Sequence, residues 1–92
     1  MLRSVTYGQL NDLLVSLGFT RSVVEGTVGY RHKPSGAFFV LHDRPPGTPA
    51  RAGDYGHIRF QLDQRGLMSR DAFEEHFALL FADTHRARTK QA

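Results

Sequence analysis

The chain has 92 residues, a length that suits one compact domain with a single hydrophobic core. It contains no cysteine, which excludes disulfide bonds, thiolate metal sites and cysteine nucleophiles. The net charge of +3 favours an anionic partner, and no stretch approaches the roughly 20 apolar residues that span a bilayer, so we expect a cytoplasmic protein with no membrane contact.

The first helix is predicted over residues 7–17. Thr6 and Gln9 have the spacing of a capping box, and Gly18 stands where a helix-ending glycine is expected. The apolar stripe of this helix consists of Leu10, Leu13, Leu14 and Leu17. Their spacing of i, i+3, i+4 and i+7 predicts one buried helix face.

Three strands are expected next, at about residues 19–24, 27–33 and 37–42, where β-branched and aromatic residues recur with a spacing near two. A tight turn joins the first two strands. Residues 33–36, which read Lys-Pro-Ser-Gly, fit a type I turn whose glycine takes positive φ in a bulge. The three strands therefore form an antiparallel meander.

The second turn sets which residues oppose each other. With Lys33 and Ala37 closing it, we expect His32 opposite Phe38 and Val28 opposite His42. One face of the sheet is then expected to hold Val28, Tyr30, His32, Phe38, Val40 and His42, and the other Gly29, Arg31, Lys33, Phe39 and Leu41.

Residues 43–53 contain three prolines and two glycines and are predicted to form a long surface loop. Asp54 is the expected N-cap of a second helix that runs through Arg65 and ends at Gly66. Tyr55, Ile58 and Leu62 are expected on its inner face.

Ser69 is predicted to cap a third helix. Its apolar stripe consists of Phe73, Phe77, Leu80 and Phe81. Residues 84–92 lack large apolar side chains and carry Arg86, Arg88 and Lys90, so they are expected to be a disordered basic tail. The element order α-β-β-β-α-α over residues 1–83 predicts one α+β two-layer domain, a three-stranded antiparallel sheet backed by helices.

His32 is the histidine that the sequence singles out as a catalytic candidate, because Arg31 and Lys33 flank it. A neutral imidazole beside fixed cations can act as a base or an acid toward a phosphodiester. The simpler interpretation is a solvated or hydrogen-bonded histidine at a strand end. The five histidines have no ligand spacing, so we expect no metal and no cofactor.

Basic residues gather on or near the second hairpin, the long loop and the start of the second helix. They are Arg31, Lys33, Arg44, Arg51 and Arg59. This set forms a candidate RNA-binding surface that follows the phosphates of the chain. The alternative is an ordinary mixed surface, in which the arginines pair with Asp43, Asp54 and Asp63.

Three strings in the order "LLVSLGF", "GTVGYRHKPSGAFFVL" and "IRFQLDQRGLMSRDAF" resemble the HicA family of small toxins from bacterial toxin–antitoxin pairs. The resemblance covers about residues 6–78. It implies a double-stranded-RNA-binding-like fold, cleavage of messenger RNA and neutralisation by a HicB-like antitoxin. The catalytic histidine of that family, in a Gly-Ser-His string, corresponds here to Thr27 or Val28. A threonine hydroxyl cannot act alone as a general base near pH 7.

Two functions follow as expectations. The first is a HicA-like RNA-binding protein, in which Thr27 joins the basic residues as an RNA-binding residue. If the protein is also an mRNA interferase, we expect His32 to act as the base and Arg31 or Lys33 to offset the charge that develops on the phosphate. The second is a noncatalytic protein-interaction module or homodimer, which an exposed strand edge and the phenylalanine-rich last helix would suit. A small-molecule enzyme has little support, because no convergent polar cluster is visible.

Overall fold

The computed structural model describes residues 5–91, with side-chain surroundings through Leu80. The elements are α1 (Tyr7–Ser16), β1 (Thr20–Val24), β2 (Thr27–His32), β3 (Ala37–His42), α2 (Ala52–Gln64) and α3 (Arg70–Gln91). The predicted order and the α+β class are confirmed. No helix within the described residues has the length and apolar character needed to cross a membrane.

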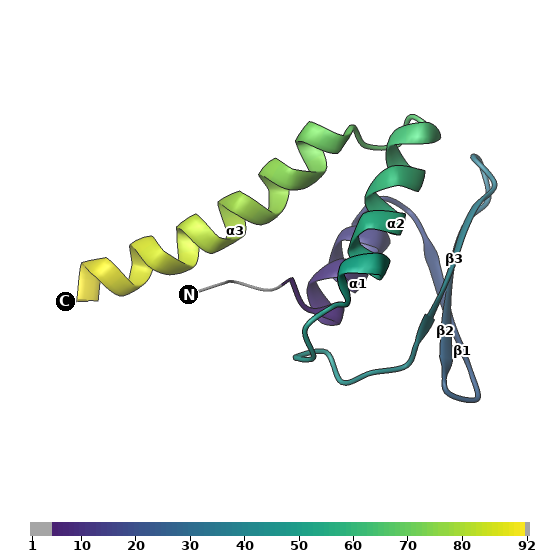
Figure 1. The fold of residues 1–92 in the computed structure, drawn as a ribbon, viewed down its shortest axis with the longest axis horizontal. Helices are drawn as coiled ribbons and strands as arrows, with labels where there is room; N and C mark the ends of the chain where they lie inside the picture. Colours follow the sequence, from purple (N-terminus) through teal and green to yellow (C-terminus); the bar gives the residue numbers. More distant parts are fainter. Residues whose placement is uncertain (1–4, 92) are drawn as a thin grey trace.

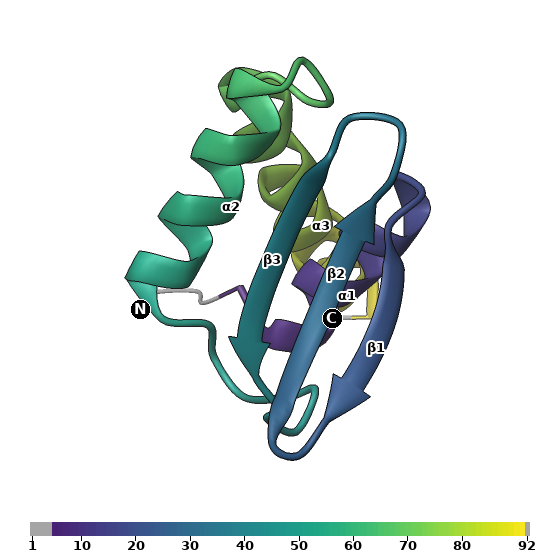
Figure 2. The same cartoon turned by 90° about the vertical axis from the view of Figure 1, so that its right-hand side faces the viewer.

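The sheet has the strand order β1-β2-β3, and both pairs are antiparallel. The helices lie on one side of it, so the sheet has a covered face and an open face (Figures 1 and 2). Figure 2 looks onto the open face, with the helices behind the strands. α3 extends away from the sheet toward its C-terminal end (Figure 1).

The first helix begins and ends as its sequence predicts. The backbone N–H of Gln9 donates to the Thr6 hydroxyl over 3.2 Å, and the backbone N–H of Thr6 donates to the Gln9 side chain over 3.0 Å. These bonds satisfy two amides that a helix start leaves unpaired. Gly18 has φ 98°, a left-handed conformation that glycine adopts without a Cβ clash.

The loop after β3 is tied to the start of α1, because Tyr7 and Gly8 donate backbone hydrogen bonds to the carbonyls of Thr48 and Pro46 over 3.0 and 2.9 Å. α2 begins at Ala52, so the expectation that Asp54 is its N-cap is wrong. Asp54 lies in the first turn of α2, where its carboxylate accepts a 2.7 Å hydrogen bond from the Tyr7 hydroxyl. A carboxylate there also suits the positive end of the helix dipole.

The third helix begins after Ser69, whose hydroxyl accepts from the Ala72 backbone N–H over 3.1 Å, as predicted. α3 then continues through Gln91 and so includes residues 84–91, for which the sequence predicts disorder. Alanine, arginine, lysine and glutamine are good helix formers, and extending an existing helix needs no new nucleus. The position of residue 92 and the side chains of residues 81–91, with Phe81 and the tail cations, lie outside the described part.

The core lies between the covered face and the helices. Its buried side chains are Leu10, Leu13, Leu14, Phe19, Val28, Tyr30, Ala37, Phe39, Leu41, Ile58, Leu62, Phe73 and Phe77. The side of α3 that carries Phe73 and Phe77 packs on Tyr55 of α2, with ring centroids 5.0 and 6.0 Å away. Phe73 and Phe77 of the predicted α3 stripe are thus buried against α2, whereas Leu80 is 36% exposed.

The pairing of β2 with β3 differs by one residue from the prediction. His32 opposes Ala37, and Val28 opposes Leu41. The carbonyl of His32 accepts the N–H of Gly36 over 2.9 Å, and Gly36 has φ 76°, so all four residues 33–36 lie within the turn. Because side chains alternate along a strand, this one-residue difference exchanges the two faces of β3.

The exchange corrects the predicted faces. The covered face of β2 and β3 carries Val28, Tyr30, His32, Ala37, Phe39 and Leu41, and the open face carries Thr27, Gly29, Arg31, Phe38, Val40 and His42. Burial supports this division, since Phe39 is 1% exposed and Phe38 is 50% exposed. The expected face that joined His32 to Phe38 and His42 does not exist.

Candidate nucleic-acid interface on the open sheet face

The open face is defined here by the residues that the strand pairing places on the uncovered side. They are Thr20, Ser22 and Val24 of β1, Thr27, Gly29 and Arg31 of β2, and Phe38, Val40 and His42 of β3. None of these residues is acidic, and Arg31 carries a permanent positive charge. The open face therefore combines exposed apolar and aromatic surface with a cation.

The Phe38 ring is the aromatic centre of the open face. Arg31 is its cross-strand partner, and the guanidinium carbon lies 5.1 Å from the ring centroid. The ring also rests beside the bare backbone of Gly29: a Cβ placed there would stand 3.5 Å from the Phe38 Cε1. These two contacts hold the ring over the strands while half of its surface stays exposed.

Thr27 and His42 are cross-strand partners at the other end of the open face. The Thr27 hydroxyl donates a 2.7 Å hydrogen bond to the carbonyl of Val24, so it stabilises the β1–β2 turn. Val28 is buried at 4% exposure on the covered face. The exposed histidine of the open face is His42.

His32 does not join the basic residues that flank it. Its ring lies on the covered side, where Nδ1 is 2.8 Å from the Ser35 hydroxyl and the ring centroid is 5.2 Å from that of Phe19. Arg31 points to the open face, because neighbours on a strand alternate. Lys33 is exposed in the turn. The arrangement supports a structural histidine at the turn.

The remaining predicted cations divide between the two layers. Arg44 is exposed in the loop just beyond the end of β3. Arg51 is exposed at the start of α2, and Arg59 of α2 forms a 2.6 Å ion pair with Glu74 of α3. The open face therefore carries Thr27 and Arg31. Beyond its opposite ends lie Lys33 and Arg44. The helical layer carries the other two, Arg51 and Arg59.

The alternative, in which the predicted arginines pair with nearby aspartates, is not what the structure shows. Among residues with described side chains, the ion pairs are those of Arg59 and Arg70 with Glu74. Asp43, Asp54 and Asp63 form none with an arginine in that part of the chain. Arg31, Lys33 and Arg44 thus stay available to an anionic partner.

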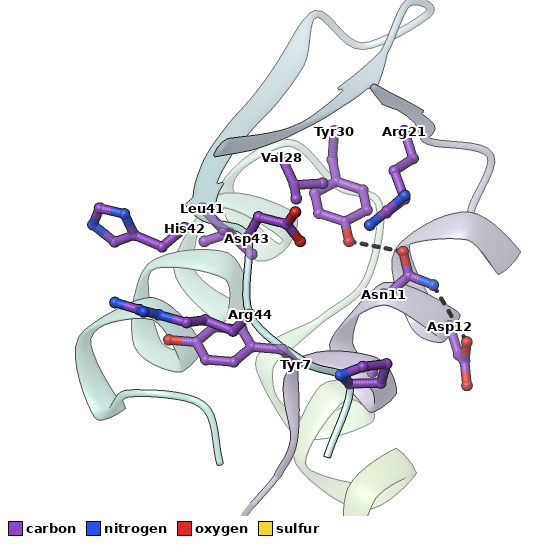
Figure 3. Close-up of a pocket in the computed structure, with 12 residues that line it drawn as sticks. Tyr7, Asn11, Asp12, Arg21, Val28, Tyr30, Leu41, His42, Asp43 and Arg44 are labelled. Atoms are coloured by element: carbon purple, nitrogen blue, oxygen red, sulfur yellow. Dashed lines mark hydrogen bonds between the residues drawn. The ribbon is translucent and has the colours of Figure 1, made fainter. Parts of the chain in front are cut away.

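A pocket of about 290 Å³ lies where α1 meets the covered face of the sheet and the loop after β3 (Figure 3). It is called the Tyr30 pocket below. It is lined by Tyr7, Gly8, Asn11, Asp12, Arg21, Val28, Tyr30, Leu41, His42, Asp43, Arg44 and Pro46. Among the described residues, no three or more side chains of His, Asp or Glu are grouped so that they could hold a metal ion.

Comparisons with protein-family models, with curated proteins and with solved structures found no match for this chain. The relationship to the HicA family, drawn from three short strings, stays a prediction. The open face and the Tyr30 pocket are therefore the candidate functional sites of this chain.

Proposed function

We propose that this protein binds single-stranded RNA on the open face of its sheet. The observation that carries the proposal is the pair of Arg31 and Phe38, a cation held against a half-exposed ring on a face with no acidic residue. Exposed aromatic rings on sheets stack on unpaired bases, and arginine contributes both charge and a planar surface to such sites.

The flanking cations extend this site beyond the ring. Lys33 follows β2 and Arg44 follows β3, and the two strands are antiparallel, so these residues lie beyond opposite ends of the open face. A single strand that stacks on Phe38 can therefore meet positive charge in both directions along the sheet. Such contacts to phosphates are independent of base sequence and weaken with salt.

Binding, and not cleavage by His32, is the activity that the geometry favours. His32 is hydrogen-bonded to Ser35 and lies on the covered side, away from Arg31. An RNA-directed protein of this kind accords with the HicA-like strings, with a cytoplasmic location and with a HicB-like partner. His42 is the histidine to vary in any assay for cleavage, because it shares the open face with Phe38.

The test is fluorescence anisotropy with a labelled single-stranded RNA of about 12 nucleotides, at salt concentrations from about 50 to 200 mM. Phe38→Ala and Arg31→Ala are each expected to weaken binding about tenfold, the loss of one stacking or charged contact. Matched controls are Phe60→Ala on α2, where the side chain is 56% exposed, and Arg70→Ala on α3. Both controls are expected to bind like the wild type.

Equal affinity of wild type and Phe38→Ala would overturn the proposal. So would the absence of RNA binding at low salt together with a stable dimer in light scattering. The second result would support the interaction-module alternative, because Val24, Phe38 and Val40 are 65%, 50% and 57% exposed on the same face and could pack against a second copy.

A further inference from the structure

The Tyr30 pocket has a rigid aromatic and aliphatic wall. Val28, Tyr30 and Leu41 of the covered face line it and are themselves 4%, 4% and 8% exposed. The Tyr30 hydroxyl donates a 2.7 Å hydrogen bond to the Asn11 side chain of α1, which fixes the plane of the ring (Figure 3). These buried side chains are packed on all other sides, so the floor of the pocket keeps its shape when a ligand enters.

Two side chains of opposite charge enter the pocket without meeting. Figure 3 shows the Asp43 carboxylate and the Arg21 guanidinium on either side of the Tyr30 ring. Within the described residues, neither side chain forms a hydrogen bond or an ion pair, with the other or with Asp12. The carboxylate offers acceptors alone and the guanidinium offers donors alone.

This arrangement suits a small ligand with hydrogen-bond donors at one edge and acceptors at another. Among the four RNA bases, guanine presents two adjacent N–H groups, N1–H and N2–H, which match the two oxygens of a carboxylate. Its O6 and N7 are adjacent acceptors that match an arginine. Adenine, cytosine and uracil each place an acceptor beside the donor of their pairing edge, and that acceptor would face the carboxylate.

We infer that the Tyr30 pocket binds one guanine base, with Asp43 on its N1–H and N2–H edge and Arg21 on its O6 and N7. The inference rests on the proposed RNA binding and adds a base preference to it. The volume of about 290 Å³ is at the lower limit of ligand pockets, about 300 to 1,000 Å³, which suits one base and not a longer segment.

The pocket and the open face adjoin each other. His42 is on the open face, and it also lines the pocket together with the next residue, Asp43. Arg44 extends away from the side on which Arg21 lies (Figure 3). Arg44 is thus placed to contact a phosphate of the nucleotide and carries no preference among bases.

The experiment is a titration of the ¹⁵N-labelled full chain with the monophosphates of guanosine, adenosine, cytidine and uridine, followed by amide chemical shifts. Guanosine monophosphate is expected to shift the amide signals of Arg21, Tyr30 and Asp43. It should bind about tenfold more tightly than the other three nucleotides, which is the affinity gained from one bidentate contact. Asp43→Asn removes this preference, and Arg44→Ala weakens all four nucleotides equally. Asp63→Asn, on the exposed side of α2, is the matched control.

Equal shifts by the four nucleotides, or a guanosine preference that survives in Asp43→Asn, would overturn the inference. A lysyl-glutamate dipeptide serves as a competing probe, because its two charges also match the pocket; shifts with the dipeptide and none with the nucleotides would make the pocket a peptide site. Phe38→Ala separates the two proposals. It lowers RNA affinity through the open face and leaves the binding of guanosine monophosphate unchanged.

Discussion

Phe38 and Phe39 are neighbours in the sequence and lie on opposite faces of β3, with 50% and 1% of their surfaces exposed. Phe39→Ala removes a ring from the core and is expected to lower the free energy of unfolding by about 3 to 5 kcal/mol. Phe38→Ala removes a surface ring and is expected to lower it by less than about 1 kcal/mol. Urea denaturation of both variants measures the difference. Similar losses would contradict the observed pairing of β2 with β3.

His32→Ala is expected to lower the free energy of unfolding by about 1 to 2 kcal/mol, because the hydrogen bond to Ser35 and the contact with Phe19 are lost. RNA affinity should stay at the wild-type value. His42→Ala is the matched control: its side chain is exposed, and the variant should keep the stability of the parent. A loss of RNA cleavage or binding in His32→Ala at unchanged stability would restore the catalytic interpretation.

The ion pair of Arg59 with Glu74 joins α2 to α3 over 2.6 Å and is partly exposed. A double-mutant cycle with Arg59→Ala and Glu74→Ala is expected to give a coupling energy of about 0.5 kcal/mol, since solvent and salt screen such pairs. Arg59→Ala should leave RNA affinity unchanged within about twofold. A loss comparable to that of Arg31→Ala would show that the helical layer also contacts RNA.

The pKa of Tyr7 lies above its ordinary value of 10.0, because burial disfavours the phenolate and the hydrogen bond to Asp54 favours the neutral hydroxyl. The unfolded chain therefore loses this proton at lower pH than the folded one. Stability contributed by Tyr7 is present below pH 10.0 and falls as the pH rises above it.

Tyr7→Phe should reduce this alkaline loss of stability, as measured by urea denaturation at pH values from about 8 to 11. Tyr55 adds to the same loss, because burial and the charge of Glu74 raise its pKa as well. The variant should therefore keep a smaller dependence on pH. If the free energy of unfolding of Tyr7→Phe falls with pH as steeply as that of the wild type, the Tyr7 hydroxyl is not shielded from solvent in the folded protein.

Most of the elements could be predicted from local signals. The capping box of Thr6 and Gln9, the left-handed glycine at position 18 and the cap at Ser69 each act within a few residues of the chain, and each is present in the structure. Asp54 shows the limit of such signals. A carboxylate near a helix start can accept hydrogen bonds from the helix backbone or from a distant side chain. Asp54 accepts one from the hydroxyl of Tyr7, which is far away in the sequence.

The sequence by itself determined the order of the helices and strands, because hydrophobic periodicity and turn residues act over short distances. Only the tertiary structure decided the faces of β3. Both of its alternating sets contain large apolar residues, so burial against the helices and the bond from Gly36 to His32 selected one of them. The same packing brought Arg21 and Asp43 to one pocket, a juxtaposition that depends on how α1 covers the sheet and that no local pattern encodes.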